Sequence, residues 1–312
     1  MHRRWLTFAT VPNQQPTTTN AAPRTVDYLT LAVLSIIWGT SYILIKKGLD
    51  VFSPAQVATL RLGISALALL PLALTHLRRI EWRQVPLLIL IGITGTGLPS
   101  FLFPFAQTEL SSSLTGMLSG LTPLCTFIVA YFFFGNREGK GRQFLGVLLG
   151  LVGAILLAWA APGQSGQTTQ FAYAGFILLA CACYALSSNL VGAYFKQTPA
   201  LTITVSSFFL VGVPAFIWAM TAGAVPETVR SSVGDTGWWG LLYVGLLAVF
   251  STVLASIVFF RMVQRTGAVF SSTVSYIIPL VALIWGLLDG EALSPWQLPA
   301  VALVLVGISL SR

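Results

Sequence analysis

The chain has 312 residues, of which 55% are hydrophobic and 8% are charged, and its mean hydropathy is +0.83. Soluble domains carry about 25% charged residues, so this composition excludes a soluble globular protein and predicts an all-α integral membrane protein. The net charge of +8 does not indicate nucleic-acid binding, because the basic residues lie in short segments between apolar runs.

The first segment, residues 1–26, is predicted to be a flexible cytoplasmic tail. Arg3 and Arg4 are followed by the polar run PNQQPTTTNAAP and not by the apolar region of a cleavable signal peptide. After the tail, the chain contains ten apolar runs that we predict to be membrane-spanning helices. They are residues 28–47, 54–75, 84–106, 112–134, 142–161, 171–194, 200–222, 237–260, 268–288 and 295–310.

The distribution of Lys and Arg predicts the orientation of these helices. If the N-terminus is cytoplasmic, the basic residues on the cytoplasmic side are Arg3, Arg4, Arg24, Arg78, Arg79, Arg83, Arg137, Lys140, Arg142, Lys196, Arg261, Arg265 and Arg312. Only Lys46, Lys47 and Arg230 then lie outside. The positive-inside rule therefore places both termini in the cytoplasm of a multi-pass inner (plasma) membrane protein.

Three landmarks recur at nearly constant separation and indicate an internal repeat. GLTPLCTFIVAYFFFG at 120–135 reads like SYIIPLVALIWGLLDG at 275–290, which aligns Pro123 with Pro279. Ser41 aligns with Ser187, and Gly153 aligns with Gly307. Each half then holds five helices, and because five is odd the halves run in opposite senses through the membrane, as in carriers with inverted repeats.

These stretches resemble the two EamA repeats of the drug/metabolite transporter superfamily over about residues 28–310. The resemblance implies a first repeat at 27–161, an extracytoplasmic linker at 162–169 and a second repeat at 170–312. It also implies a central cavity lined mainly by helices 1, 3, 4, 6, 8 and 9, with helices 5 and 10 at the periphery. One departure is Asn136, which stands where the family usually has Glu; Glu138 follows two residues later, and Glu291 holds the matching place in the second half.

Polar and aromatic side chains at mid-span depth are the candidates for the cavity lining. They face the interior because polar groups in lipid are costly. The alternative for each Ser or Thr is a hydrogen bond to its own helix backbone. The candidates are Trp38, Ser41, Tyr42, Tyr184, Ser187, Asn189, Ser251, Thr252, Ser275 and Tyr276.

Proline marks helices that are interrupted, and glycine marks a helix that can pack closely against a neighbour. Pro99, Pro123 and Pro279 interrupt apolar runs and are hinge candidates, with tolerated kinks as the alternative. Gly146 and Gly150 give the fifth run a face of small residues for close packing. That face suits a scaffold or a homodimer contact through helices 5 and 10.

Arg61 lies inside the second apolar run, where an Arg costs about 2.5–3.5 kcal/mol at the centre of a membrane helix. It lies about two turns from the outer end, which is shallow enough to reach the outer headgroups or the end of a neighbouring helix as a structural anchor. The other interpretation is that Arg61 gives the cavity a positive potential that favours solutes with a carboxylate.

Chemical motifs are few. No Asp or Glu lies deep in a predicted span, and Glu109, Asp289 and Glu291 are at the outer rim. The sequence has no Walker loop and no metal-ligand or catalytic cluster at membrane depth, so we expect neither cofactor nor enzymatic activity. Cys125, Cys181 and Cys183 are expected to be buried free thiols.

We therefore predict a secondary carrier that binds a small-molecule metabolite in the lipid bilayer and has no nucleic-acid partner. The resemblance implies export and amino-acid-like or other amphipathic solutes. A multidrug efflux carrier is the main alternative, and a channel, receptor or structural membrane protein is a lesser one. Without a deep carboxylate, proton coupling would need Glu109, so uncoupled or exchange transport carries equal weight.

Overall fold

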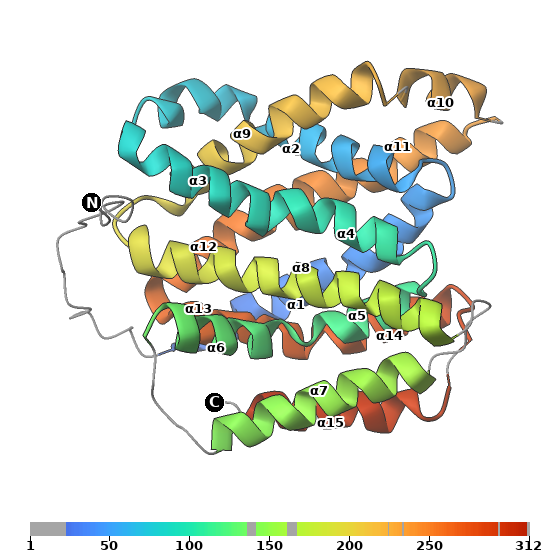
Figure 1. Cartoon of the computed structure of the whole chain (residues 1–312). Coiled ribbons are helices and arrows are strands. Elements are labelled where there is room, and N and C mark those ends of the chain that lie inside the picture. The colour runs from blue at the N-terminus through green and yellow to red at the C-terminus, as the bar shows by residue number, and fades with distance from the viewer. Residues whose placement is uncertain are drawn as a thin grey trace, which may run out of the picture.

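The computed structural model describes residues 23–135, 142–160, 167–223, 225–232, 234–292 and 294–310. Within these ranges every regular element is helical, and the long helices run side by side along one axis (Figure 1). The first helix starts and the last helix ends at the same end of this bundle (Figure 1).

The helices of the first half are joined by short connections. They are α1 (Thr25–Leu49), α2 (Pro54–Leu77), η1 (Trp82–Gln84), α3 (Val85–Gly92), η2 (Ile93–Gly97), α4 (Leu98–Ala106), α5 (Ser112–Ser119), α6 (Thr122–Phe133) and α7 (Arg142–Ala160).

The second half contains the remaining elements. They are α8 (Gln167–Tyr194), α9 (Ala200–Met220), α10 (Val225–Ser231), α11 (Thr236–Leu246), η3 (Leu247–Leu254), α12 (Ala255–Thr266), α13 (Ala268–Ser271), η4 (Ser272–Tyr276), α14 (Ile278–Leu288) and α15 (Gln297–Leu310). The first helices of the two halves, α1 and α8, run in opposite directions along the bundle (Figure 1).

Local signals explain where the helices begin. Ser53 precedes α2 and its hydroxyl accepts the Gln56 amide N–H at 3.3 Å, while the Gln56 side chain accepts the Ser53 N–H at 2.9 Å. This capping box and Pro54 in the first turn start α2 directly after a short turn from α1. Ser111 caps α5 in the same way through the Leu114 N–H.

Among the described residues, eight helices or helix runs are long and apolar enough to cross a membrane, by length and composition. The predicted spans 142–161 and 295–310 correspond to α7 and α15, whose apolar stretches Leu148–Leu157 and Gln297–Gly307 are shorter. The chain is therefore a multi-pass membrane protein. That it has ten membrane-spanning helices stays a prediction.

Three predicted segments fall partly or wholly outside the described residues. Of the predicted tail, residues 1–22 lie outside, whereas Thr25 and Val26 already belong to α1. Of the predicted linker, residues 162–166 lie outside and 167–169 belong to α8. Asn136 and Glu138, where the first half departs from the EamA pattern, also lie outside the described ranges.

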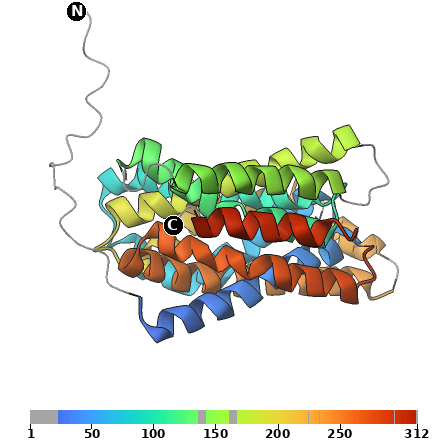
Figure 2. The same cartoon turned by 90° about the horizontal axis from the view of Figure 1, so that it is seen from below.

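The peripheral pair α7 and α15 pack against each other along their length at one side of the bundle (Figures 1 and 2). Their contact is close because glycines face each other: a Cβ at Gly307 would lie 2.6 Å from the Gly146 carbonyl oxygen. The small-residue face predicted on this helix thus packs within the chain. A homodimer through this pair would use its outward faces, where Leu148, Val152 and Ile155 of α7 and Leu298 and Val306 of α15 are exposed.

The long helices of the centre are irregular at matching places in the two halves. Residues of η2 and η3 form π-helical turns in the middle of the third and the eighth predicted spans. The fourth and ninth spans are interrupted as well, between α5 and α6 and at η4. Pro123 and Pro279 stand in the first turn of the helices that follow these interruptions, and Pro99 stands in the first turn of α4.

Candidate substrate cavity

A cavity lies among these irregular segments in the middle of the bundle. It is lined by residues of α1, α2, η2, α4, α5, α6, α8, η3, α12 and the α13–α14 region. Its volume is about 90 Å³. A single water needs about 10–15 Å³ on the same measure, so the cavity has room for several waters or a small organic solute.

Most of the predicted lining residues are brought together around this cavity. The structure places nine of the eleven polar or charged candidates on its wall, namely Trp38, Ser41, Tyr42, Arg61, Tyr184, Ser187, Ser251, Thr252 and Ser275. They come from five helices that are far apart in the sequence.

Two candidates lie off the wall. The Asn189 side-chain amide donates to the Ala185 carbonyl at 2.8 Å and to the Thr126 carbonyl at 3.2 Å, so it joins α8 to α6. Tyr276 is half-buried at the end of η4 and packs against the hydrophobic core. A cavity role for either residue remains an untested prediction.

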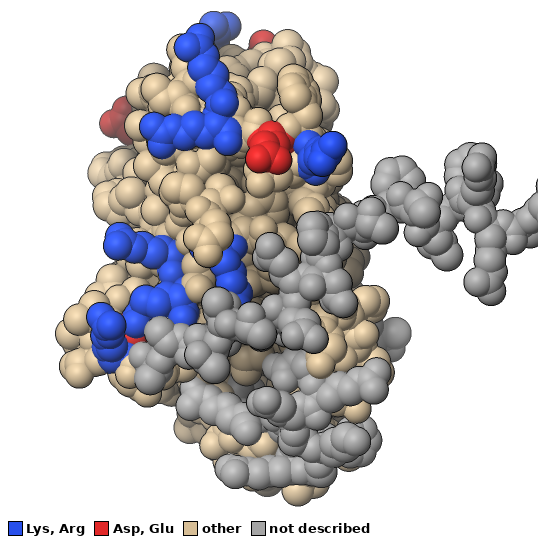
Figure 3. Space-filling model, turned by 90° about the vertical axis from the view of Figure 1, so that its left-hand side faces the viewer, with Lys and Arg blue, Asp and Glu red and all other residues tan. Residues whose placement is uncertain are grey.

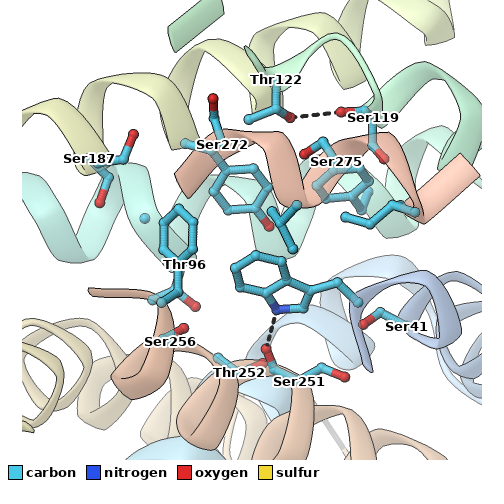
Figure 4. Close-up of a pocket in the computed structure, with 18 of the residues that line it drawn as sticks. Ser41, Thr96, Ser119, Thr122, Ser187, Ser251, Thr252, Ser256, Ser272 and Ser275 are labelled. Carbon is cyan, nitrogen blue, oxygen red and sulfur yellow. Dashed lines mark hydrogen bonds between the residues drawn. The ribbon is translucent and has the colours of Figure 1, made fainter. Parts of the chain in front are cut away.

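Several wall residues were not among the candidates from the sequence, and many of them are Ser or Thr (Figure 4). Hydroxyl residues are common in apolar runs, so only the packing shows which ones face the cavity. The polar or aromatic residues that were missed are Thr96, Phe103, Ser119, Thr122, Thr126, Ser188, Ser256, Phe259, Phe260 and Ser272.

Two hydrogen bonds join α1 to the π-helical turn of η3 at the cavity wall. The Trp38 indole N–H donates to the Ser251 carbonyl at 2.8 Å (Figure 4). In return, the Ser251 hydroxyl donates to the Ile37 carbonyl at 3.3 Å. A wide turn leaves carbonyls without helical partners, and these two bonds attach α1 to η3 at that place.

Aromatic rings form the apolar part of the wall. Phe103 lies between Tyr42 and Tyr184, with ring centroids 5.6 Å and 5.9 Å away, and Trp38 packs edge-on against Phe259 at 5.1 Å. Aromatic walls with hydroxyl groups between them suit a solute that has an apolar body and a polar end.

Arg61 is the charged residue of the wall, and its exposed fraction is 7%. Its Nε donates to the Thr252 hydroxyl at 2.7 Å, and the Tyr184 hydroxyl interacts with the same guanidinium. None of the ion pairs among the described residues includes Arg61.

The acidic residues that do form ion pairs lie at the two ends of α1. Near its C-terminal end, Lys46 contacts Asp289 at 2.7 Å and Glu291 at 2.8 Å, and Lys47 contacts Asp289 at 2.6 Å. At its N-terminal end, Asp27 pairs with Arg265 of α12. Both ends of α1 are thus attached to the second half of the chain.

Glu291 also caps α5. Its carboxylate accepts the Ser112 and Ser113 amide N–H groups at 2.9 Å and 3.0 Å and the Ser112 hydroxyl at 2.7 Å. Burial alone would raise its pKa, but the bonds from Lys46, Ser113 and Ser112 lower the pKa to about 2. The pKa of Asp289 is lowered too, because Lys46 and Lys47 outweigh the effect of its burial.

The end of the bundle at which α1 begins is strongly basic. Figure 3 shows Lys and Arg side chains gathered in groups on this end, with few acidic side chains between them. Helix ends and connections bring these residues there: Arg24, Arg78, Arg79, Arg83, Lys196, Arg261 and Arg265. The predicted orientation makes this the cytoplasmic end.

Within the described ranges, no group of three or more His, Cys, Asp or Glu side chains could hold a metal ion. Cys125, Cys181 and Cys183 are buried free thiols, as expected from the sequence.

The model of the EamA-like transporter family matches residues 26–159 and again residues 172–312. The chain belongs to the EamA-like transporter family. It is therefore a membrane transporter, which confirms the resemblance drawn from the sequence.

Named relatives in this family cover most of the chain. The uncharacterized inner membrane transporter YedA of Escherichia coli is 23% identical over 90% of this chain and 88% of its own length. An S-adenosylmethionine/S-adenosylhomocysteine transporter of Chlamydia muridarum is 26% identical over 88% of each chain. A probable terminal-alkyne amino-acid exporter of Streptantibioticus cattleyicolor is 24% identical over 90% of this chain and 91% of its own.

A solved structure has the same fold. It aligns with a TM-score of 0.64 over 93% of this chain and 97% of its own, at 18% sequence identity. At that identity the likeness concerns the fold alone.

Proposed function

We propose that this protein is a secondary carrier of the inner membrane that exports a small amphipathic metabolite, amino-acid-like in size, by alternating access. The observation that carries the proposal is the central cavity, since the predicted repeats 27–161 and 170–312 both contribute to its wall. Irregular helix segments adjoin it in each half, which is where carriers place their solute sites.

The relatives support the solute class and the direction. One is named for S-adenosylmethionine and S-adenosylhomocysteine, which both contain an amino-acid group, and another for an amino acid that it exports. The name of the E. coli relative supports placement in the inner membrane.

Multidrug efflux is the second candidate, because the aromatic rings of Trp38, Tyr42, Phe103, Phe259 and Phe260 line the cavity. Such a wall suits flat lipophilic solutes. Against it stands Arg61, a cation in a wall whose residues include no Asp or Glu.

The test is counterflow in proteoliposomes, with candidates first taken from the metabolites that accumulate outside cells only when the protein is present. A carrier gives saturable uptake that rises when the same solute is preloaded inside. Flux that increases linearly with concentration and shows no trans-stimulation would indicate a channel. The absence of flux for every candidate would favour a receptor or a structural role.

A further inference from the structure

We propose that Arg61, oriented by the Thr252 hydroxyl and flanked by the Tyr184 hydroxyl, forms a subsite that binds the single carboxylate of the transported solute. The inference rests on the proposed carrier function and specifies its substrate class as monocarboxylates, zwitterions included. It makes Arg61 the residue that determines specificity against lipophilic cations.

The first step is where the Arg61 side chain lies. Residues 56–63 of α2 are all buried, because α4, α9 and η3 pack around the helix at this level. The guanidinium therefore has no lipid-facing side from which to reach the headgroups. It lies on the wall of the cavity and bonds to Thr252 of the neighbouring η3.

The second step is the missing countercharge. A buried cation is costly unless it is paired, and an ion pair is the usual solution. The described acidic residues are at helix ends or in connections: Asp27, Asp50, Glu81, Glu109, Glu227, Asp235, Asp289 and Glu291. None of them lines the cavity, so a bound anion is the group that can neutralise Arg61 there.

The third step is how the guanidinium is oriented. The Thr252 hydroxyl donates its proton to the Leu247 carbonyl at 3.1 Å across the π-helical turn. Its oxygen is then left to accept Arg61 Nε, which holds the plane of the guanidinium. A ligand then has the terminal N–H groups that Tyr184 does not use, and two such groups match the two oxygens of a carboxylate.

The residues around Arg61 determine which apolar group and which charge the solute can have beside its carboxylate. Tyr184 carries a hydroxyl beside Arg61 and a ring that stacks on Phe103, so it adjoins both the charged and the aromatic parts of the wall. One unpaired cation balances a monoanion better than a dianionic phosphate. The basic end of the bundle in Figure 3 adds a long-range potential that attracts anions toward the protein.

The experiment measures ligand-induced thermal stabilisation of the purified protein and counterflow in proteoliposomes, using matched probes. The pairs are L-phenylalanine with L-phenylalaninamide and hexanoate with hexanamide, and phenyl phosphate and tetraphenylphosphonium are added as single probes. We expect at least one carboxylate to act at concentrations at least tenfold lower than its amide, and both single probes to act more weakly. This comparison needs no mutation.

Variants then assign the preference to Arg61. Arg61→Gln is expected to remove the tenfold preference, and Arg61→Lys to retain part of it, because it keeps the charge but not the fork. The matched control is Arg230→Gln, since Arg230 is exposed on α10 and does not line the cavity, and it should behave as the unmodified protein.

The outcomes separate this inference from the carrier function. Equal action of acid and amide, action by no carboxylate, preference for the phosphate, or an Arg61→Gln variant that keeps the preference would each overturn the subsite. In all of these cases saturable counterflow of any other solute would leave the carrier standing. A complete absence of counterflow would instead contradict the carrier.

Discussion

Glu291 supplies hydrogen-bond acceptors for backbone N–H groups that have no partner within the helix at the start of α5. It is the second-half acid that the sequence analysis placed at the outer rim, and the structure bonds it to Lys46 and to the start of α5. A carboxylate at a helix N-terminus satisfies free N–H groups and is stabilised by the helix dipole. The residue thus joins three helices of both halves.

We expect Glu291→Gln to lower the thermal stability of the purified protein at neutral pH. A folded pKa near 2 against an ordinary value of 4.5 corresponds to roughly 3 kcal/mol. Because the folded pKa is the lower one, this stabilisation is present above pH 4.5 and is lost as the pH falls from 4.5 toward 2. The difference in melting temperature between the protein and the variant should therefore close over that range.

The control for this prediction is Glu227→Gln, since Glu227 is an exposed acid on α10. It should leave the melting temperature unchanged at every pH. A Glu291→Gln difference that stayed constant down to pH 2 would show that the charge of Glu291 is not responsible.

Trp38 offers a test of the bonds that cross the cavity. Trp38→Phe keeps a ring but removes the donor to the Ser251 carbonyl, and we expect it to lower kcat/KM in transport by a few-fold, because the bond that holds α1 against η3 at the cavity is lost. Trp38→Ala removes the ring as well and should lose at least tenfold. Membrane abundance should be unchanged, as for the control Trp82→Ala, whose side chain is 89% exposed. Losses that track abundance would contradict the assignment.

At the scale of the helix, the α7–α15 pair serves as a support that does not line the cavity. Neither helix contributes to the cavity wall, and their glycines allow the two backbones to approach closely. Stability and transport should therefore be separable here.

Gly307→Ala is expected to reduce thermal stability by about 1–3 kcal/mol, because the new methyl group would meet the backbone of Gly146 and Gly150. Transport per folded molecule should stay the same. Gly245→Ala is the matched control, since a Cβ at Gly245 meets nothing within 4 Å, and it should be neutral. Lower transport per folded molecule in Gly307→Ala would give this pair a part in the transport cycle.

The helices were largely predictable, whereas only those irregularities that proline or glycine accompanies were visible in the sequence. A span needs about 20 apolar residues, so composition locates it within a few positions. The glycines of η2 were visible as GITGTG, but the run LAVFSTVL of η3 has no residue that announces a wide turn. Such turns arise from packing between helices. For the same reason the contact of Arg61 with Thr252, 191 positions away, could not be read from the sequence.

At the scale of the whole molecule, the predicted orientation can be tested at positions that lie at opposite ends of the described bundle. Reporter fusions after Arg79 and Lys196 should be active on the cytoplasmic side, and fusions after Asp50 and Arg230 on the outside. An outside signal after Lys196 would reverse the second half and contradict the inverted arrangement.

The matching π-helical turns in the third and eighth predicted spans have an energetic consequence. If one half bends as the other straightens, the outward-open and the inward-open state each contain one bent half and one straight half. The two states then differ little in free energy. The sequence has no Walker loop, so no ATP hydrolysis would bias them. If no ion gradient is coupled to it either, such a protein speeds transport equally in both directions, and the solute's own gradient decides the net flow. A cell would release a compound that it overproduces through this protein. It would take the compound up again when the external concentration is higher.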